Sequence, residues 1–220
     1  ATMKSQRGVA LIVAVLLVAL ATLIVASLID TTDLALARTR NAVREQQAHA
    51  YARGLETWAL DWLRRDQNEE PGIDSNGDIW ARPLPPLDVQ GGRIGGRLRD
   101  LNGCFNLNHL VVNGVEDALA RRRFDRLLRA LKLPPEIADA VVDYADADNE
   151  SGPRGAEDMA YLLASPPRRA ANQPFAHLSE LRLVRGVDEA AFRTLEAHVC
   201  ANPEASPINV NTATPPVLLS

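Results

Sequence analysis

The first feature of the chain is an apolar run that is long enough to cross a membrane. From Val9 to Ile29 the sequence has no charged residue, and only Thr22 and Ser27 are mildly polar. A helix rises about 1.5 Å per residue, so this run spans a hydrocarbon core roughly 30 Å thick. We predict a transmembrane helix over residues 9–29; the alternatives are a buried core helix and a secretory signal peptide.

The charges that flank the run predict its orientation. Lys4 and Arg7 precede it, whereas Asp30 and Asp33 follow it. Under the positive-inside rule the basic end stays in the cytoplasm. The rest of the chain, from residue 30 onward, is therefore expected on the outer side of the membrane.

Beyond the run, the pattern predicts a continuing helix and then strands. The helix is expected to reach Pro71, with one apolar face that packs on a sheet and contains Tyr51, Leu55, Trp58 and Trp62. Strand signals follow over residues 79–108. Asn102-Gly103 lies between two strand-like runs there and predicts a hairpin turn.

Helical spacing returns from residue 116 to about residue 199, where four helices are expected. The first of them carries an apolar face made of Leu119, Phe124, Leu127, Leu128 and Leu131. A return strand is predicted at Ile208–Val210, and a short helix without a terminator follows, so further sequence is expected after it. The predicted fold class is α+β: a long N-terminal helix packed on a small antiparallel sheet, with a large all-helical insertion between strands.

Composition and charge weigh against two classes of protein. The 220 residues are 46% apolar and 24% charged, which excludes a disordered chain. The first 29 residues hold only Lys4 and Arg7 as charges, so residues 30–220 carry 22 basic and 28 acidic side chains, a net charge of −6. This acidic body weighs against a dedicated nucleic-acid binder.

The densest acidic cluster runs from Asp146 to Asp158. With Asp146 as position 1, oxygen ligands fall at positions 1, 3 and 5, and Glu157 falls at position 12, as in an EF-hand loop. Gly152 at position 7 and Pro153 at position 8 disagree with a true EF-hand. A calcium site and a solvated acidic loop both remain open on these residues alone.

If the loop binds calcium, its expected ligands are the carboxylates Asp146, Asp148, Glu150, Glu157 and Asp158. Carboxylates this close repel one another without a cation, so the metal is expected to stabilise the fold. A second acidic stretch, residues 74–78, resembles a calcium loop but has Pro85 at position 12. We predict a turn there.

Cys104 and Cys200 are the only cysteines. In an oxidising compartment such a pair predicts a disulfide, which closes a loop of about 97 residues and contributes ~4–5 kcal/mol in the chain-entropy model. Two buried free thiols are the alternative. No catalytic residues are predicted, because no nucleophile or phosphate-binding motif occurs and no metal-ligand spacing links the histidines, which are His49, His109, His177 and His198.

Two strings, Leu183–Ala191 and Ile208–Ala213, resemble helix-hairpin-helix modules that bind DNA through backbone N–H groups. Asp188 stands where such a module usually has its second glycine, and its carboxylate would repel phosphate. We interpret the hairpin as a packing unit. The alternative function that it suggests is a membrane-tethered DNA-binding protein of competence.

The N-terminus resembles the leader of type IV pilins and pseudopilins, a short basic segment that ends in Gly before an apolar helix. The resemblance implies that a prepilin peptidase cuts between Gly8 and Val9 and methylates Val9. Ala1 and Thr2, before Met3, are interpreted as a remnant of expression.

The fifth mature position, usually Glu in this class, is Val13. A carboxylate at membrane depth is costly unless it meets a partner, in this class the N-terminal ammonium of the neighbouring subunit. In lacking this Glu, the chain resembles the K-type minor pseudopilins (GspK family) of type II secretion systems. Strings that match this family lie at Gly103–Asn108, Gly155–Asp158, Tyr161–Leu163, Ser179–Leu183 and Ile208–Ala213.

The resemblance implies a minor pseudopilin at the tip of the pseudopilus that starts its assembly with I- and J-type minor pseudopilins for protein export. An H-type minor pseudopilin is implied as a further partner. It also implies contacts with the prepilin peptidase and the inner-membrane assembly platform, a periplasmic body, bound structural calcium, and neither enzyme activity nor nucleic-acid binding. The expected segments are the leader (1–8), the transmembrane helix (9–29), the pilin-like helix and first strands (30–115), the inserted helical domain (116–206) and the return strand with the start of a further segment (207–220).

Overall fold

The computed structural model describes residues 7–69, 71–204 and 206–220. By their internal contacts they form two compact units. One unit contains the chain up to Arg64 together with Leu84–Gly96, and the other contains Arg65–Pro83 together with Arg97–Ser220.

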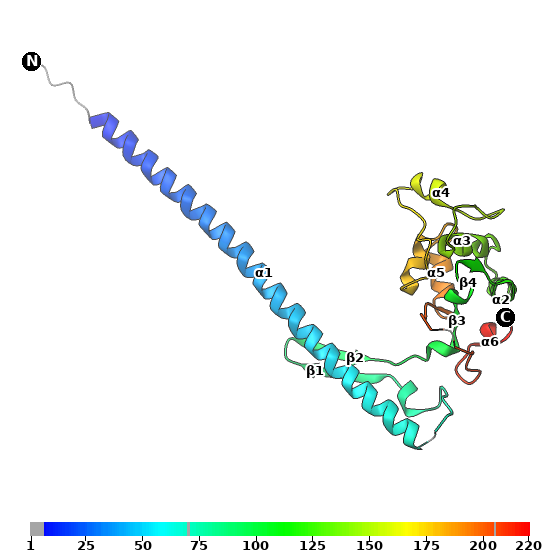
Figure 1. Cartoon of the computed structure of the whole chain (residues 1–220). Coiled ribbons are helices and arrows are strands. Elements are labelled where there is room, and N and C mark those ends of the chain that lie inside the picture. Colours follow the sequence, from blue (N-terminus) through cyan, green and yellow to red (C-terminus); the bar gives the residue numbers. More distant parts are fainter. Residues whose placement is uncertain (1–6, 70, 205) are drawn as a thin grey trace, which may run out of the picture. The chain divides into compact units, whose positions relative to one another are not determined.

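The first unit is built on one long helix, α1 (Arg7–Glu69), which Figure 1 shows as an uninterrupted ribbon. It contains no proline and only Gly8 and Gly54 as glycines, so nothing in its sequence breaks it. Its N-terminal part is exposed on all sides and is apolar enough to cross a membrane, with a mean hydropathy of 3.1 over the best window. The predicted long helix is therefore confirmed.

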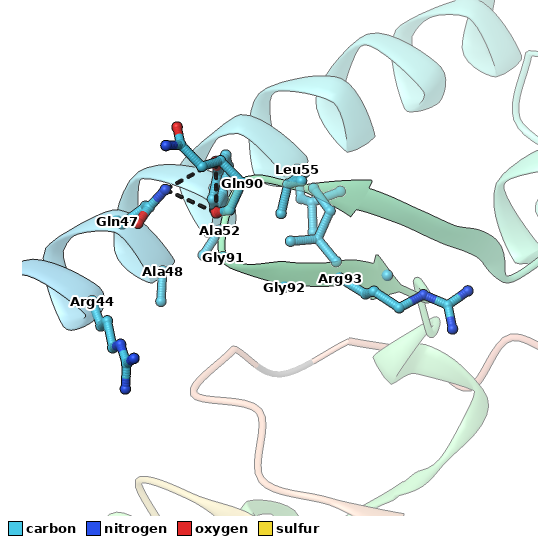
Figure 2. Close-up of a pocket in the computed structure, with 13 residues that line it drawn as sticks. Arg44, Gln47, Ala48, Ala52, Leu55, Gln90, Gly91, Gly92 and Arg93 are labelled. Carbon is cyan, nitrogen blue, oxygen red and sulfur yellow. Dashed lines mark hydrogen bonds between the residues drawn. The ribbon is translucent and has the colours of Figure 1, made fainter. Parts of the chain in front are cut away.

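A β-hairpin lies against the C-terminal half of α1. Its strands β1 (Leu84–Val89) and β2 (Gly92–Gly96) pair antiparallel, and Gly91 turns the chain between them with a φ of 91°. Figure 2 shows how the turn is held: Gln47 Nε2 donates to the Gln90 carbonyl at 2.9 Å, and the Tyr51 hydroxyl donates to the same oxygen at 3.3 Å. Tyr51 and Leu55 of the predicted apolar face lie against the hairpin, and all four side chains of that face are half-buried.

A groove of about 830 Å³ runs between α1 and β2 in this unit. Arg44, Ala48 and Leu55 line it from the helix, and Gly91 and Gly92 line it from the hairpin (Figure 2). Within the described residues β2 pairs only with β1, so the outer edge of β2 offers unpaired backbone groups.

The second unit is mainly helical and contains two short strand pairs. Strands β4 (Val111–Val112) and β5 (Val115–Glu116) are antiparallel, whereas β3 (Phe105–Asn106) and β6 (Val199–Cys200) are parallel. Between β5 and β6 lie the helices of the predicted insertion, which are α2 (Ala118–Ala130), α3 (Glu136–Ala145), α4 (Asp158–Leu162) and α5 (Glu189–Leu195). The remaining helical segments of this unit are α6 (Pro215–Leu218) and the 3₁₀ helices Ile79–Ala81, Leu101–Gly103, Leu107–His109 and Leu178–Leu183.

The core of this unit lies where α2, α3 and α5 meet the short strands. Phe124 of α2 is fully buried and stacks on Phe105 of β3, with ring centroids 5.2 Å apart. Leu127, Leu128 and Ile137 are buried beside them. The predicted apolar face of α2 is present, although Leu119 is about half exposed.

The predicted hairpin at Asn102-Gly103 is wrong. These residues end a 3₁₀ helix in which the Asp100 carboxylate accepts a hydrogen bond from the Asn102 N–H at 2.8 Å. The glycine is required for another reason: a Cβ at Gly103 would collide with Thr212. The chain beyond it pairs with distant β6, and a local turn signal contains no information about that partner.

The predicted strand at Ile208–Val210 is also absent, because this segment is coil and turn. Asn209 holds it through its side-chain amide, which donates to the Asp74 carbonyl and to the Asp100 carboxylate, each at 2.9 Å. The Asn209 side-chain oxygen also accepts from the Asn211 N–H at 3.0 Å. Side-chain hydrogen bonds, two of them to distant parts of the chain, stand here in place of strand pairing.

Candidate metal centre

Three carboxylates converge between α3 and α4 in the second unit. Asp143 lies in the last turns of α3, Asp146 follows the end of that helix, and Glu157 precedes the first residue of α4. Each contributes one oxygen to a set in which all the oxygens lie within 4.8 Å of one another. The helix-loop-helix connection thus brings together acids that are 14 residues apart at most in the sequence.

These carboxylates are buried, and two of them have oxygens without a hydrogen-bond partner. Asp143, Asp146 and Glu157 are 4%, 8% and 5% exposed. Within the described part of the chain, Asp146 Oδ1 and both Glu157 oxygens are buried without any hydrogen-bond partner. A buried charge without a partner is costly, so the arrangement requires either a proton or a cation.

The pKa values of the cluster are raised in consequence. Burial raises the pKa of Asp146 to about 6, and the neighbouring carboxylates Asp148 and Asp143 add to the effect. Burial raises the pKa of Glu157 to about 7, with Asp146 and Asp143 adding to it. Burial also raises the pKa of Asp143, although hydrogen bonds from the following loop oppose this shift.

The loop is shaped around Asp143. The Gly152 N–H donates to its carboxylate at 3.0 Å, and Ser151 Oγ lies 3.3 Å from it. A Cβ at Gly155 would collide with the same carboxylate, so only glycine fits there. The loop therefore closes on the carboxylate through residues with little or no side chain.

A separate ion-pair network ties the loop to the helices. Asp139, one turn before Asp143 on α3, pairs with Arg121 of α2 and, at 2.9 Å, with Arg154 of the loop. Asp139 is buried, but its charge is balanced by these two guanidinium groups. It therefore holds the loop in place and is not available to a metal.

The set of acids differs from the one expected from the sequence. Asp146 and Glu157 belong to the cluster, whereas Asp148 and Glu150 lie on the exposed side of the loop, where Asp148 accepts from the Glu150 N–H at 2.7 Å. Asp158 accepts from the Ala170 N–H at 3.0 Å and lies 3.6 Å from an Arg169 nitrogen.

Sequence reasoning missed Asp143, because it lies in the helix before the loop. A signal was present: Asp139, Asp143 and Asp146 recur at a spacing of four and three residues, which places them on one helix face. An acidic stripe on the buried side of an otherwise apolar helix indicates a buried charge site.

Hard oxygen donors without nitrogen or sulfur suit Ca²⁺ or Mg²⁺, and flexible carboxylates from a loop suit the larger Ca²⁺. The unpaired oxygens of Asp146 and Glu157 fit this role. A second acid group, Asp66, Asp74 and Asp78, is more exposed, and Asp78 is occupied by the Ser75 N–H at 2.7 Å. Residues 74–78 therefore form the expected turn.

The two cysteines are joined. The structure forms a disulfide between Cys104 and Cys200, with their Cα atoms 5.8 Å apart, next to the β3–β6 pair. Both residues are buried.

The remaining predicted sites lie at the N-terminus or in the helix-hairpin-helix-like string Leu183–Ala191. Residues 1–6 are outside the described residues, and for Gly8 and Val9 only the backbone is described, so cleavage and methylation stay predictions. Val13 lies in the exposed apolar part of α1. Asp188 accepts from the Ala191 N–H at 2.7 Å and caps α5, as expected of a packing unit.

Comparisons with known proteins identify the family. Residues 103–204 match the family model described as type II secretion system (T2SS), protein K. Type II secretion system protein K of Pseudomonas aeruginosa is 42% identical over 226 residues, covering 98% of this chain and 68% of the relative. The protein of the same name from Pectobacterium carotovorum subsp. carotovorum is 38% identical, covering 95% and 67%.

A solved structure agrees with these relatives. A chain in the crystal structure of the GspK-GspI-GspJ complex from the enterotoxigenic Escherichia coli type 2 secretion system matches with a TM-score of 0.71 and 33% identity. The match covers 82% of this chain and 68% of that chain. The comparisons lend no support to the DNA-binding alternative. The chain belongs to the type II secretion system protein K family, and so it is a minor pseudopilin, a structural component of the secretion system and not an enzyme.

Proposed function

We propose that this minor pseudopilin stands at the tip of the pseudopilus, joins I- and J-type minor pseudopilins there, and starts assembly of the fibre. The observation that carries this proposal is the surface of α1, whose apolar N-terminal part is exposed on all sides. Such a surface needs a membrane before assembly and neighbouring helices after it. The related crystallised complex contains GspK, GspI and GspJ.

The proposed membrane topology is supported by the charges that flank the apolar run. We propose that the apolar part of α1 is anchored in the bacterial inner membrane and that residues 30–220 lie in the periplasm. The H-type minor pseudopilin, the prepilin peptidase and the assembly platform belong to the same proposal. A disulfide between Cys104 and Cys200 is consistent with an oxidising compartment.

Calcium is the second part of the proposal. Asp143, Asp146 and Glu157 would hold a structural Ca²⁺, because their carboxylates converge in a buried place where Asp146 Oδ1 and both Glu157 oxygens lack the partners that burial demands. The bound cation would neutralise the cluster and fix the start of α4 relative to the end of α3. Calcium titrations of the wild type and of Glu157→Gln test this, with Asp148→Asn as the matched control outside the cluster. Tight binding by Glu157→Gln would refute the assignment.

The experiment that tests the tip assignment is co-purification. The full chain in detergent is mixed with I- and J-type partners, once with calcium chloride and once with EDTA. The expected result is a one-to-one-to-one complex in calcium. Failure to form a complex in either buffer would refute the partner assignment, whereas a complex in both buffers would make the metal dispensable for assembly.

A further inference from the structure

The short helix α4 presents an exposed apolar ridge. Met159, Leu162 and Leu163 follow one another at helical spacing and are 75%, 44% and 86% exposed. Figure 1 shows α4 at the side of the second unit that is opposite to α6. Large apolar side chains that cluster on a projecting element mark an interaction site more often than a chance exposure.

A pocket of about 390 Å³ opens beside this ridge. Leu163 forms one wall, and the buried Tyr161 lies behind it. Two arginines complete the lining, Arg168 and Arg185. The Arg168 guanidinium carbon lies over the Tyr161 ring, 5.2 Å from the ring centroid, so a cation–π contact holds the guanidinium group in place.

Neither arginine has a carboxylate partner within the described ranges of the chain. Arg168 donates to the Leu183 carbonyl at 2.9 Å, and its Nε is buried with no acceptor. Arg185 donates to the Gly155 carbonyl at 3.3 Å. By contrast, the nearby Arg169 is close to Asp158. The pocket therefore holds two cations that form no ion pair with an acid in the described ranges.

We propose that this pocket, together with the α4 ridge, binds an acidic and apolar segment of a partner protein. A carboxylate of the segment would accept hydrogen bonds from Arg168 and Arg185, and an adjacent apolar residue would cover Leu163 and Met159. Charge-assisted bonds from guanidinium groups to carboxylate are directional and strong, which suits such a site. The inference does not depend on where the protein stands in the pseudopilus.

An anionic lipid would offer phosphate to the same arginines. The protein as a whole opposes that ligand, because residues 30–220 carry a net charge of −6 and an anionic surface would repel them. A single acidic side chain approaches only the two arginines. A peptide carboxylate is therefore the ligand that these charges favour.

The test uses the full chain in a neutral detergent with calcium chloride, so that the carboxylate cluster stays in one state. It is incubated with a bead library of random capped seven-residue peptides, and the bound peptides are sequenced. We expect enrichment of Asp or Glu next to a large apolar residue. The best peptide and its Gln or Asn counterpart are then compared by fluorescence anisotropy, and the amide peptide should bind about tenfold more weakly.

Three variants locate the binding. Arg168→Gln should weaken binding of the acidic peptide about tenfold, and Arg185→Gln should weaken it severalfold. Leu163→Ser changes a side chain that is almost fully exposed, so it tests the ridge without disturbing the fold, and it should weaken binding severalfold. Arg123→Gln, an exposed arginine of α2, is the matched control and should leave binding unchanged.

Several outcomes would overturn the proposal. They are a library without acidic enrichment, equal binding of the amide peptide, and equal loss with Arg123→Gln. Unchanged affinity in both Leu163→Ser and Arg168→Gln would remove the binding from this pocket. A short-chain phosphatidylglycerol that displaces the peptide, and itself binds more tightly in an Arg168-dependent manner, would assign the site to lipid instead.

Discussion

The two units of this protein differ in where their apolar side chains go. In the described ranges, every buried side chain belongs to the second unit, from Trp80 to Val217. The unit built on α1 has a half-buried face under its hairpin and an apolar N-terminal part exposed on all sides. One unit therefore buries an apolar core of its own, although the α4 ridge stays exposed, whereas the other leaves its apolar surface for a membrane and for other subunits.

The same contrast holds for the bonds between distant residues. A disulfide and buried ion pairs join residues far apart in the second unit, as between Cys104 and Cys200 or between Arg121 and Asp139. The helix of the first unit is held mainly by its own backbone, and its hairpin by a few hydrogen bonds to Gln90. The comparison predicts large effects of substitution in the second unit and small, local ones in the first.

The largest effect is expected from Phe124→Ala. The side chain is fully buried against Phe105, so its removal should lower the free energy of unfolding by about 3–5 kcal/mol. Urea denaturation followed by near-ultraviolet circular dichroism measures it. Leu60→Ala, at an exposed position of α1, is the control and should change stability by about 0.5 kcal/mol or less. Equal losses in the two variants would contradict the comparison.

The next largest effect on stability is expected from loss of the disulfide. Replacement of both Cys104 and Cys200 by alanine should lower the free energy of unfolding by about 2–5 kcal/mol, because the unfolded chain gains the freedom of a long loop. The same urea experiment, with and without dithiothreitol, measures this. Reduction should destabilise the wild type and leave the double variant unchanged; a response of the double variant would point to another cause.

The carboxylate cluster should make stability depend on pH and on metal. In EDTA the folded protein holds protons on Asp146 and Glu157 more tightly than the unfolded chain does, since burial raises their pKa values to about 6 and about 7. Their contribution is therefore most favourable in acid and is lost as the pH rises from about 4 to about 7. Above pH 7, calcium at a hundred times its Kd should raise the free energy of unfolding by about 2.7 kcal/mol.

Thermal unfolding of the wild type and Glu157→Gln at pH 5 and pH 8 checks this prediction. In EDTA the variant should gain stability relative to the wild type at pH 8, since its amide needs no proton. Calcium should stabilise only the wild type. If pH and calcium change the thermal stability of the wild type no more than that of the variant, the cluster binds no cation.

The smallest effect is expected in the first unit, from Gln47→Ala. This variant loses the bonds to the Gln90 carbonyl and to the Tyr51 hydroxyl, so local opening of the hairpin should become easier by about 1 kcal/mol. Hydrogen exchange of the amides in β1 and β2 measures this, with Gln46→Ala on the exposed side of α1 as the control. Faster exchange throughout the second unit would mean that the two units are not energetically separate.

Much of the fold was predictable because it is local. The apolar run, the uninterrupted helix to Glu69 and the helices α2, α3 and α5 all follow from spacing that neighbouring residues share, whereas α4 was not predicted. The conformation of Asn102-Gly103 was not predictable in this way, because the Asp100 carboxylate holds this dipeptide in a 3₁₀ helix instead of the predicted hairpin.

The sequence by itself determined the anchor-like helix, the acidic body, the cysteine pair and the acidic loop between two helices. Only the tertiary structure decided the parallel pairing of β3 with β6 and the entry of Asp143 into the carboxylate cluster in place of Asp148, Glu150 and Asp158. It also brought Arg168 and Arg185 to one pocket. The physical reason is common to all three: periodicity specifies which face a residue lies on, whereas burial and pairing depend on residues brought close only by the folded chain.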